Sequence, residues 1–219
     1  IAHAVSWHKK DQPDVHPEPL VTKITNADVL NENWVYADKR PEMQEWARGY
    51  TGALERRGRM VLTIWPEHCI IGSTGHSVVP NINAALQRWA ERSGRPVNYV
   101  MKGQNLRVEM YSALQAEVPD PLDQNTGLNT ELLSLLKTSD RLLICGQAMS
   151  HCVNFTTRDI IENWDKKMSS IVLLTDGSSP VPTFEVEAEE FKRHCSARGV
   201  TLNTIKEAFS DCKAKPANA

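Results

Sequence analysis

The sequence predicts a three-layer α/β/α domain with a mostly parallel sheet. Short apolar runs, rich in β-branched residues, alternate with helix-like segments along most of the chain. Strands that alternate with helices pair in parallel through right-handed crossovers, and the helices then cover both faces of the sheet. The length of 219 residues suits one such domain, so we expect a single domain over residues 1–219.

The N-terminal region, residues 1–58, is predicted to be a loop-rich segment followed by one helix. Residues 1–35 are rich in His, Asp, Asn and Pro without a long periodic pattern, although residues 20–24 could form a short extended piece. From Pro41 onward, apolar residues recur at spacings of three and four. Pro41 suits the first helical turn and Gly58 suits the end, so this stretch predicts a helix.

Two strands and a helix are predicted next. Residues 60–65 form a β-branched run that Pro66 ends, and residues 96–101 read as a buried strand that ends at Lys102. Between them, residues 80–92 carry apolar side chains on one helical face, and Gly94 follows as a stop signal.

The remaining elements follow the same alternation. Residues 104–126 look irregular, because Pro119 and Pro121 argue against a continuous helix. Helices are expected at 128–136, 153–164 and 183–197, strands at 142–145, 170–175 and 200–205, and a flexible Lys-rich tail at 206–219.

Composition and charge exclude several function classes. The chain is 41% hydrophobic and 24% charged, and it has no apolar run long enough for a membrane span. A net charge of −2 gives no electrostatic reason to bind nucleic acid or an anionic membrane. The five cysteines are odd in number and include no CxxC pair, so free thiols in a reducing cytoplasm are expected.

A cysteine at a predicted helix start is the strongest sign of chemistry. The segment from Gly146 to Val153 leaves a buried strand at a glycine, turns through small residues and enters a helix at Cys152. Unpaired amides and the helix dipole at that position favour the thiolate, which is the nucleophilic form of cysteine. Cys152 is therefore the candidate nucleophile, although an arbitrary cysteine is more often buried for packing.

Three signals follow successive predicted strands: His68 after Trp65-Pro-Glu, Lys102, and Cys152. In an open parallel sheet, ligands bind at this carboxyl edge, so the three could share one pocket. Each also has an ordinary explanation, since a lysine at a strand end is usually solvated and His68 could be a turn residue.

Taken together, these segments resemble a known family. Gly146-Gln-Ala-Met-Ser-His-Cys-Val153 resembles the nucleophile motif of the isochorismatase-like cysteine hydrolases, although Met149 replaces the usual Thr or Ser. Trp65-Pro-Glu-His-Cys69 resembles a segment of their nicotinamidase (pyrazinamidase) branch, and Lys102-Gly with Tyr111-Ser-Ala is similar to that branch's lysine loop. The resemblance covers about residues 60–205 and implies a Rossmann-like sheet.

The resemblance implies a cysteine-dependent amidase that converts a small aromatic amide, such as nicotinamide, to the acid and ammonia through a thioester. Cys152 would be the nucleophile, Lys102 would stabilise its thiolate, and the amides of Ala148 and Cys152 would form the oxyanion hole. A cis peptide would lie between Ala148 and Met149. The substrate pocket would be walled by Trp65, Tyr111 and His151.

A divalent metal, zinc, iron or manganese, is also implied by the resemblance, with no organic cofactor. His68 and His3 are the best matches to its histidine ligands, and an alignment that uses His8 and His16 ranks second because Ser6 is a poor ligand. Family members begin with a strand that ends in a catalytic aspartate. This chain opens at Ile1 without such a strand, so reduced turnover is expected.

Other functions remain open at this point. A different hydrolase of the same superfamily would act on an enol ether or a carbamoyl group, and the Trp65-to-His68 segment counts against it. A non-catalytic pseudoenzyme or assembly subunit would keep the fold for binding or oligomerisation. The sequence leaves the exact substrate, the metal and the formation of a homo-oligomer undecided.

Overall fold

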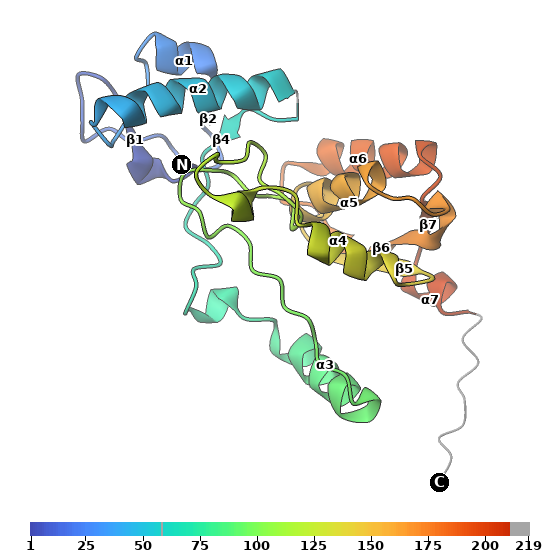
Figure 1. The fold of residues 1–219 in the computed structure, drawn as a ribbon. Helices are drawn as coiled ribbons and strands as arrows, with labels where there is room; N and C mark the ends of the chain where they lie inside the picture. The colour runs from blue at the N-terminus through green and yellow to red at the C-terminus, as the bar shows by residue number, and fades with distance from the viewer. Residues whose placement is uncertain (58, 211–219) are drawn as a thin grey trace. The chain divides into compact units, whose positions relative to one another are not determined.

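The computed structural model describes residues 1–57 and 59–210, so Gly58, the expected helix end, lies outside the described residues. The chain divides into two compact units, Ile1–Met101 and Lys102–Ala219, which appear blue to green and green to red in Figure 1. That a single domain covers the whole chain stays a prediction.

The described residues of the first unit form short strands and three α-helices. Its strands pair in two antiparallel ladders, β1 with β3 and β2 with β4, rather than in the parallel arrangement that the sequence predicts. The elements are η1 (Ala4–Ser6), β1 (Trp7–His8), β2 (Lys23–Ile24), α1 (Asn26–Leu30), β3 (Val35–Tyr36), α2 (Pro41–Arg57), β4 (Leu62–Thr63), η2 (Thr74–His76) and α3 (Pro80–Ser93).

Local chemistry explains where these helices begin and end. Helix α1, which the periodicity did not indicate, starts at a capping box in which Thr25 and Asp28 exchange side-chain and backbone hydrogen bonds. Helix α2 starts at Pro41, as predicted, and buries one face that includes Ala47 and Leu54. Helix α3 ends at Gly94 in the left-handed region (φ 64°), which confirms the predicted stop.

Two predicted strands differ in the structure. The run at 60–65 is a strand only over β4, with an isolated bridge at Trp65, and the run at 96–101 forms no strand. Pro96 has no amide hydrogen to donate, and the side chains of Tyr99 and Met101 are exposed. A strand needs a neighbour to satisfy its backbone groups, and β-branched composition alone does not supply one.

The second unit holds a parallel sheet of the order β5-β6-β7. This sheet and its helices confirm the α/β class. The elements of the unit are η3 (Gln124–Thr126), α4 (Thr130–Lys137), β5 (Leu142–Gln147), α5 (Cys152–Glu162), η4 (Met168–Ser170), β6 (Ile171–Ser179), α6 (Glu185–Ala197), β7 (Thr201–Asn203) and α7 (Ile205–Ala208).

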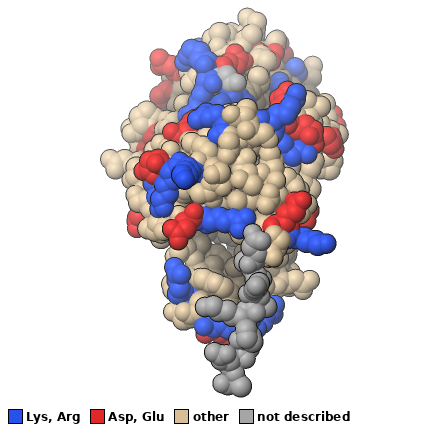
Figure 2. Space-filling model, turned by 90° about the vertical axis from the view of Figure 1, so that its right-hand side faces the viewer, with Lys and Arg blue, Asp and Glu red and all other residues tan. Residues whose placement is uncertain are grey.

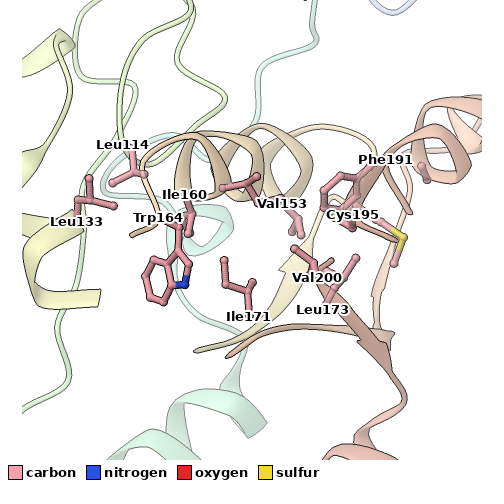
Figure 3. Close-up of a cluster of buried hydrophobic side chains, with 13 residues drawn as sticks. Leu114, Leu133, Val153, Ile160, Trp164, Ile171, Leu173, Phe191, Cys195 and Val200 are labelled. Carbon is pink, nitrogen blue, oxygen red and sulfur yellow. The ribbon is translucent and has the colours of Figure 1, made fainter. Parts of the chain in front are cut away.

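Alternating side chains of β6 face the two sides of this sheet. Ile171 and Leu173 enter the larger core, which Figure 3 shows with side chains of α5 and α6 such as Ile160 and Phe191. On the opposite face, Val172 and Leu174 form a small cluster with Ala208 of α7. Helices α5 and α6 therefore pack on one face of the sheet and the short helix α7 on the other, which agrees with the predicted layering.

The C-terminal segment is ordered further than expected. The predicted flexible tail starts at residue 206, but α7 is helical up to Ala208. Thr204 and Glu207 form a capping box, and Asp176 of β6 accepts a hydrogen bond from the amide of Ile205 at 2.7 Å. These contacts fix the first turn after β7. Residues 211–219 lie outside the described residues.

The surface agrees with the low net charge. Lys and Arg side chains are interspersed with Asp and Glu on the face shown in Figure 2, with no broad area of one sign. Within the described residues, no helix has the length and apolar character needed to cross a bilayer. Cys69, Cys145, Cys152 and Cys195 are free thiols.

Candidate active site

A tight turn connects β5 to α5 and carries the candidate nucleophile. Strand β5 ends at Gln147 and helix α5 begins at Cys152. Gly146 has a φ of 123°, a conformation that disfavours other residues, and its amide donates to the hydroxyl of Ser178 on β6 at 3.0 Å. The pairing with β6 shifts register between Ile144 and Gly146, just before the turn.

Backbone hydrogen bonds hold this turn in one conformation. The carbonyl of Ala148 accepts from the amides of His151 and Val153 at 3.0 and 3.1 Å, and Met149 donates to the carbonyl of Ser179 at 2.8 Å. Within residues 1–57 and 59–210, no acceptor is described for the amides of Ala148 and Cys152. No side chain caps the N-terminus of α5. Two donors of the turn are therefore available for an anion.

The cis peptide lies one residue earlier than predicted. It joins Gln147 to Ala148, not Ala148 to Met149. Gln147 still pairs with Ser179 in the β5–β6 ladder, and Met149 already donates to the carbonyl of the same serine. Both residues therefore contact the end of β6, and the chain changes direction between them.

The cysteines of the second unit lie in contrasting surroundings. Cys152 is partly exposed at the first position of α5. Cys195 on α6 is completely buried, and burial raises the pKa of its thiol to about 12. Cys195 therefore stays a protonated packing group, whereas Cys152 is accessible to a reagent or substrate.

Aromatic rings surround the residue next to the thiol. The ring of His151 lies 5.4 Å from that of Tyr111 and 4.7 Å from that of Phe184, with an edge-on angle of 80° to Phe184. Tyr111 also packs against Phe155, at 5.2 Å between ring centroids. These contacts bring the predicted residues Tyr111 and His151 together beside Cys152. Together with Phe184 they form one aromatic wall.

Two residues of this site were missed by sequence reasoning. Phe184 lies just before α6, and only its aromatic type after Pro182 could have drawn attention. Ser150 lies inside the nucleophile motif, but its hydroxyl contacts Val181, which is 31 positions away. No local pattern reports such a tertiary contact.

Lys102 is the first residue of the second unit. Its side chain is partly buried, and its ammonium donates to the carbonyl of Met110 at 2.8 Å. The lysine does not follow a strand, contrary to the prediction, because residues 96–101 form none. Its proposed contact with the Cys152 thiolate stays a prediction.

The first unit brings His3, Trp65 and His68 together. His3 and Trp65 form a parallel bridge, and the rings of Trp65 and His68 lie 6.3 Å apart. The Nδ1 atom of His68 lies 2.7 Å from the carbonyl of Pro66, so it carries the hydrogen and leaves Nε2 as an acceptor. Although His3 is exposed at the surface, partial desolvation lowers its pKa, and proximity to His68 contributes.

These histidines do not form a complete metal site. A carbonyl partner such as that of Pro66 is the usual support for a metal-binding histidine, which favours His68. However, the described part of the chain contains no group of three or more His, Cys, Asp or Glu suited to a metal ion. Catalytic zinc sites use three protein ligands, whereas His3 and His68 supply two. We therefore derive no chemical step through a metal.

The predicted site residues thus fall into two groups, one in each unit. His3, Trp65 and His68 belong to the first unit. Lys102 and the turn between β5 and α5, which we call the thiol turn because Cys152 follows it, belong to the second. That both groups share one pocket stays a prediction.

Comparison with known proteins identifies relatives of this chain. No protein-family model matches it. The nicotinamidase of Escherichia coli (strain K12) is 27% identical over 147 residues, which cover 66% of this chain and 60% of that protein. The chain is similar in sequence to this nicotinamidase over part of its length. The similarity confirms the predicted resemblance to this group of proteins.

One solved structure supports the predicted fold. The yeast nicotinamidase bound to the inhibitor nicotinaldehyde matches with a TM-score of 0.50 and 22% identity, covering 66% of this chain and 60% of that one. An Acinetobacter baumanii nicotinamidase has a TM-score of 0.49 and 18% identity, with 68% and 62% covered. The chain spans about 60% of the length of the curated nicotinamidase that it matches.

Proposed function

We propose that this chain is a cysteine-dependent amide hydrolase that converts a small aromatic amide, such as nicotinamide, to its carboxylic acid and ammonia. The observation that carries the proposal is the position of Cys152, a partly exposed thiol at the start of α5 beside amides without a described acceptor. The relationship to nicotinamidases supplies the substrate class.

The reaction proceeds in two steps. In the first, the sulfur of Cys152 attacks the amide carbonyl, and the amides of Ala148 and Cys152 stabilise the oxyanion that forms. The carbon–nitrogen bond then breaks, the proton that the thiol has lost goes to the leaving nitrogen, and ammonia departs. In the second step, water attacks the thioester, the acid is released, and the thiol is restored.

The other predicted residues bind the substrate or the thiolate. Lys102 supplies positive charge near the thiolate, and the aromatic wall of Tyr111, His151 and Phe184 packs against the substrate ring. That Trp65 takes part in substrate binding stays a prediction. The soft, polarisable faces of these side chains suit a flat heteroaromatic amide better than an aliphatic one.

The test compares two cysteine variants. Purified chain is incubated with nicotinamide, and ammonia and nicotinate are measured over time. Cys152→Ala is expected to abolish turnover. Cys145→Ala is the matched control, because Cys145 is also an exposed free thiol, on the strand that leads into the same turn. It is expected to retain the rate of the unmodified chain.

Two further observations separate this function from its alternatives. A catalytic Cys152 is alkylated by iodoacetamide near pH 6 faster than Cys145, which peptide mass spectrometry measures directly. Equal alkylation of both thiols, together with no turnover of nicotinamide, contradicts the proposal and favours a non-catalytic binding or assembly role. Turnover that survives in Cys152→Ala removes the thiol from the mechanism.

A further inference from the structure

Ser150 lies in the turn between β5 and α5, and its hydroxyl contacts His151 of the aromatic wall. Its side chain is almost completely buried, with 1% of its surface exposed. The hydroxyl oxygen lies 3.0 Å from the amide nitrogen of Val181 and 2.9 Å from Nδ1 of His151. One buried hydroxyl therefore connects the turn before Cys152 with the segment after β6 and with the histidine ring.

The direction of each hydrogen bond follows from the number of donors. A hydroxyl has one hydrogen and two acceptor positions. The amide of Val181 can only donate, so it takes one acceptor position of the oxygen. In the described part of the chain, the hydrogen of the Ser150 hydroxyl has Nδ1 of His151 as its acceptor. If Nδ1 carried a proton instead, this hydrogen would be buried without a partner, which is unfavourable.

We propose that Ser150 is a positioning residue that holds neutral His151 as the tautomer with its hydrogen on Nε2. The ring of Phe184 packs edge-on against the imidazole of His151, with 4.7 Å between the ring centroids, and restricts its rotation. Ser150 thus determines which nitrogen donates, and Phe184 determines the plane in which it donates. The ring presents a hydrogen-bond donor of fixed direction.

The role in substrate selection rests on the proposed function. A fixed Nε2–H favours a ligand that offers an acceptor, such as the carbonyl oxygen or the ring nitrogen of a heteroaromatic amide. A ligand that offers only a donor or a C–H group there cannot accept this hydrogen bond, and the loss of a directed hydrogen bond reduces binding. Ser150 therefore acts on specificity through His151, without touching the substrate itself.

Nitrogen NMR of the full chain tests the tautomer directly. The histidines are labelled with ¹⁵N, the His151 signals are assigned by their loss in His151→Gln, and spectra are recorded above the ordinary histidine pKa. The unmodified chain is expected to show protonated Nε2 and unprotonated Nδ1. Ser150→Ala is expected to give averaged shifts of both tautomers, and Ser150→Thr, which keeps the hydroxyl, is expected to retain the original pattern.

Ser178→Ala is the matched control, because Ser178 also accepts from a backbone amide of this turn but contacts no histidine in the described structure. It is expected to leave the His151 signals unchanged. Protonated Nδ1 in the unmodified chain overturns the proposal, whether or not any variant folds. An unchanged tautomer in folded Ser150→Ala overturns it as well.

Kinetics add a second, separate readout. With nicotinamide, Ser150→Ala is expected to raise KM by about three- to tenfold with a smaller change in kcat, as for the loss of one neutral hydrogen bond. Equal KM values for the unmodified chain and for Ser150→Ala contradict the role of Ser150 in substrate selection. Absence of turnover in the unmodified chain contradicts the proposed function, whereas the NMR result still decides the role of Ser150.

Discussion

The ammonium of Lys102 donates to the backbone carbonyl of Met110 at 2.8 Å, so this lysine closes the loop between the two residues. The contact uses one of the three ammonium hydrogens and leaves the positive charge in place. Loop closure and thiolate stabilisation are therefore separable properties of one side chain.

Replacement of Lys102 can distinguish these properties. Lys102→Gln keeps a donor for Met110 but removes the charge, and kcat/KM for nicotinamide is expected to fall about tenfold or more because the thiolate loses its cationic neighbour. Lys102→Arg keeps the charge and is expected to retain most activity. Alkylation of Cys152 by iodoacetamide should slow in parallel in the glutamine variant. A glutamine variant with the original rates would assign Lys102 to loop closure alone.

The buried core predicts a large difference between two positions of α6. Phe191 is fully buried among the side chains of Figure 3, and Phe191→Ala is expected to lower the free energy of unfolding by about 3–5 kcal/mol. Val186 on the same helix is 66% exposed, and Val186→Ala should change the free energy of unfolding by less than about 0.5 kcal/mol. Urea unfolding followed by circular dichroism measures both. Similar losses in the two variants would contradict the described packing.

Cys195 predicts a loss of stability at alkaline pH. Burial raises the pKa of its thiol from 9.0 to about 12 in the folded chain. Below the ordinary pKa of 9.0, the thiol is protonated in both the folded and the unfolded chain, so it does not change the free energy of unfolding. As pH rises from there toward the folded value, only the unfolded chain ionises, so the free energy of unfolding falls.

The measurement compares the unmodified chain with Cys195→Ala. Between about pH 8 and about pH 10, the unmodified chain should lose about 1.4 kcal/mol more than the alanine variant, which lacks the thiol. Using the difference between the two chains removes the contribution of other groups that titrate in this range. Identical pH dependence would show that Cys195 ionises equally in both states.

Metal content tests the histidines of the first unit. Because His3 and His68 supply only two ligands, zinc is expected to remain substoichiometric after gel filtration in metal-free buffer, as measured by mass spectrometry of the eluted protein. His76→Ala serves as the control, since His76 is an exposed histidine of the same region. Stoichiometric zinc that is lost in His68→Ala but retained in His76→Ala would reveal a further ligand.

The sequence predicts helices better than it predicts isolated strands. Helix α3 follows from its apolar spacing and from Gly94, both of which act within a few residues. The run at 96–101 has the composition of a strand, but a strand depends on a partner elsewhere in the chain. Strands β5, β6 and β7 have such partners in one another, so their positions were predicted within a few residues.

The residues of the candidate site also differ in whether the sequence predicts them. Cys152 could be found from sequence because a glycine, a turn and a helix start are neighbours along the chain. Ser150 and Phe184 could not, because contacts with Val181 and with the ring of His151 define their roles. Sequence motifs therefore locate the reactive group, whereas its supporting contacts are tertiary.

The register shift between β5 and β6 makes the length of β6 a determinant of the thiol turn. Ile144 pairs with Leu173, yet Gly146, only two positions later, pairs with Ser178. Five residues of β6 therefore span the distance of two on β5. Removing one of them would move Ser178 and Ser179 to opposite faces of the sheet and detach the hydrogen bonds of Gly146 and Met149. Homologous enzymes with this turn should therefore tolerate substitutions in the segment between Leu173 and Ser178 much more readily than insertions or deletions.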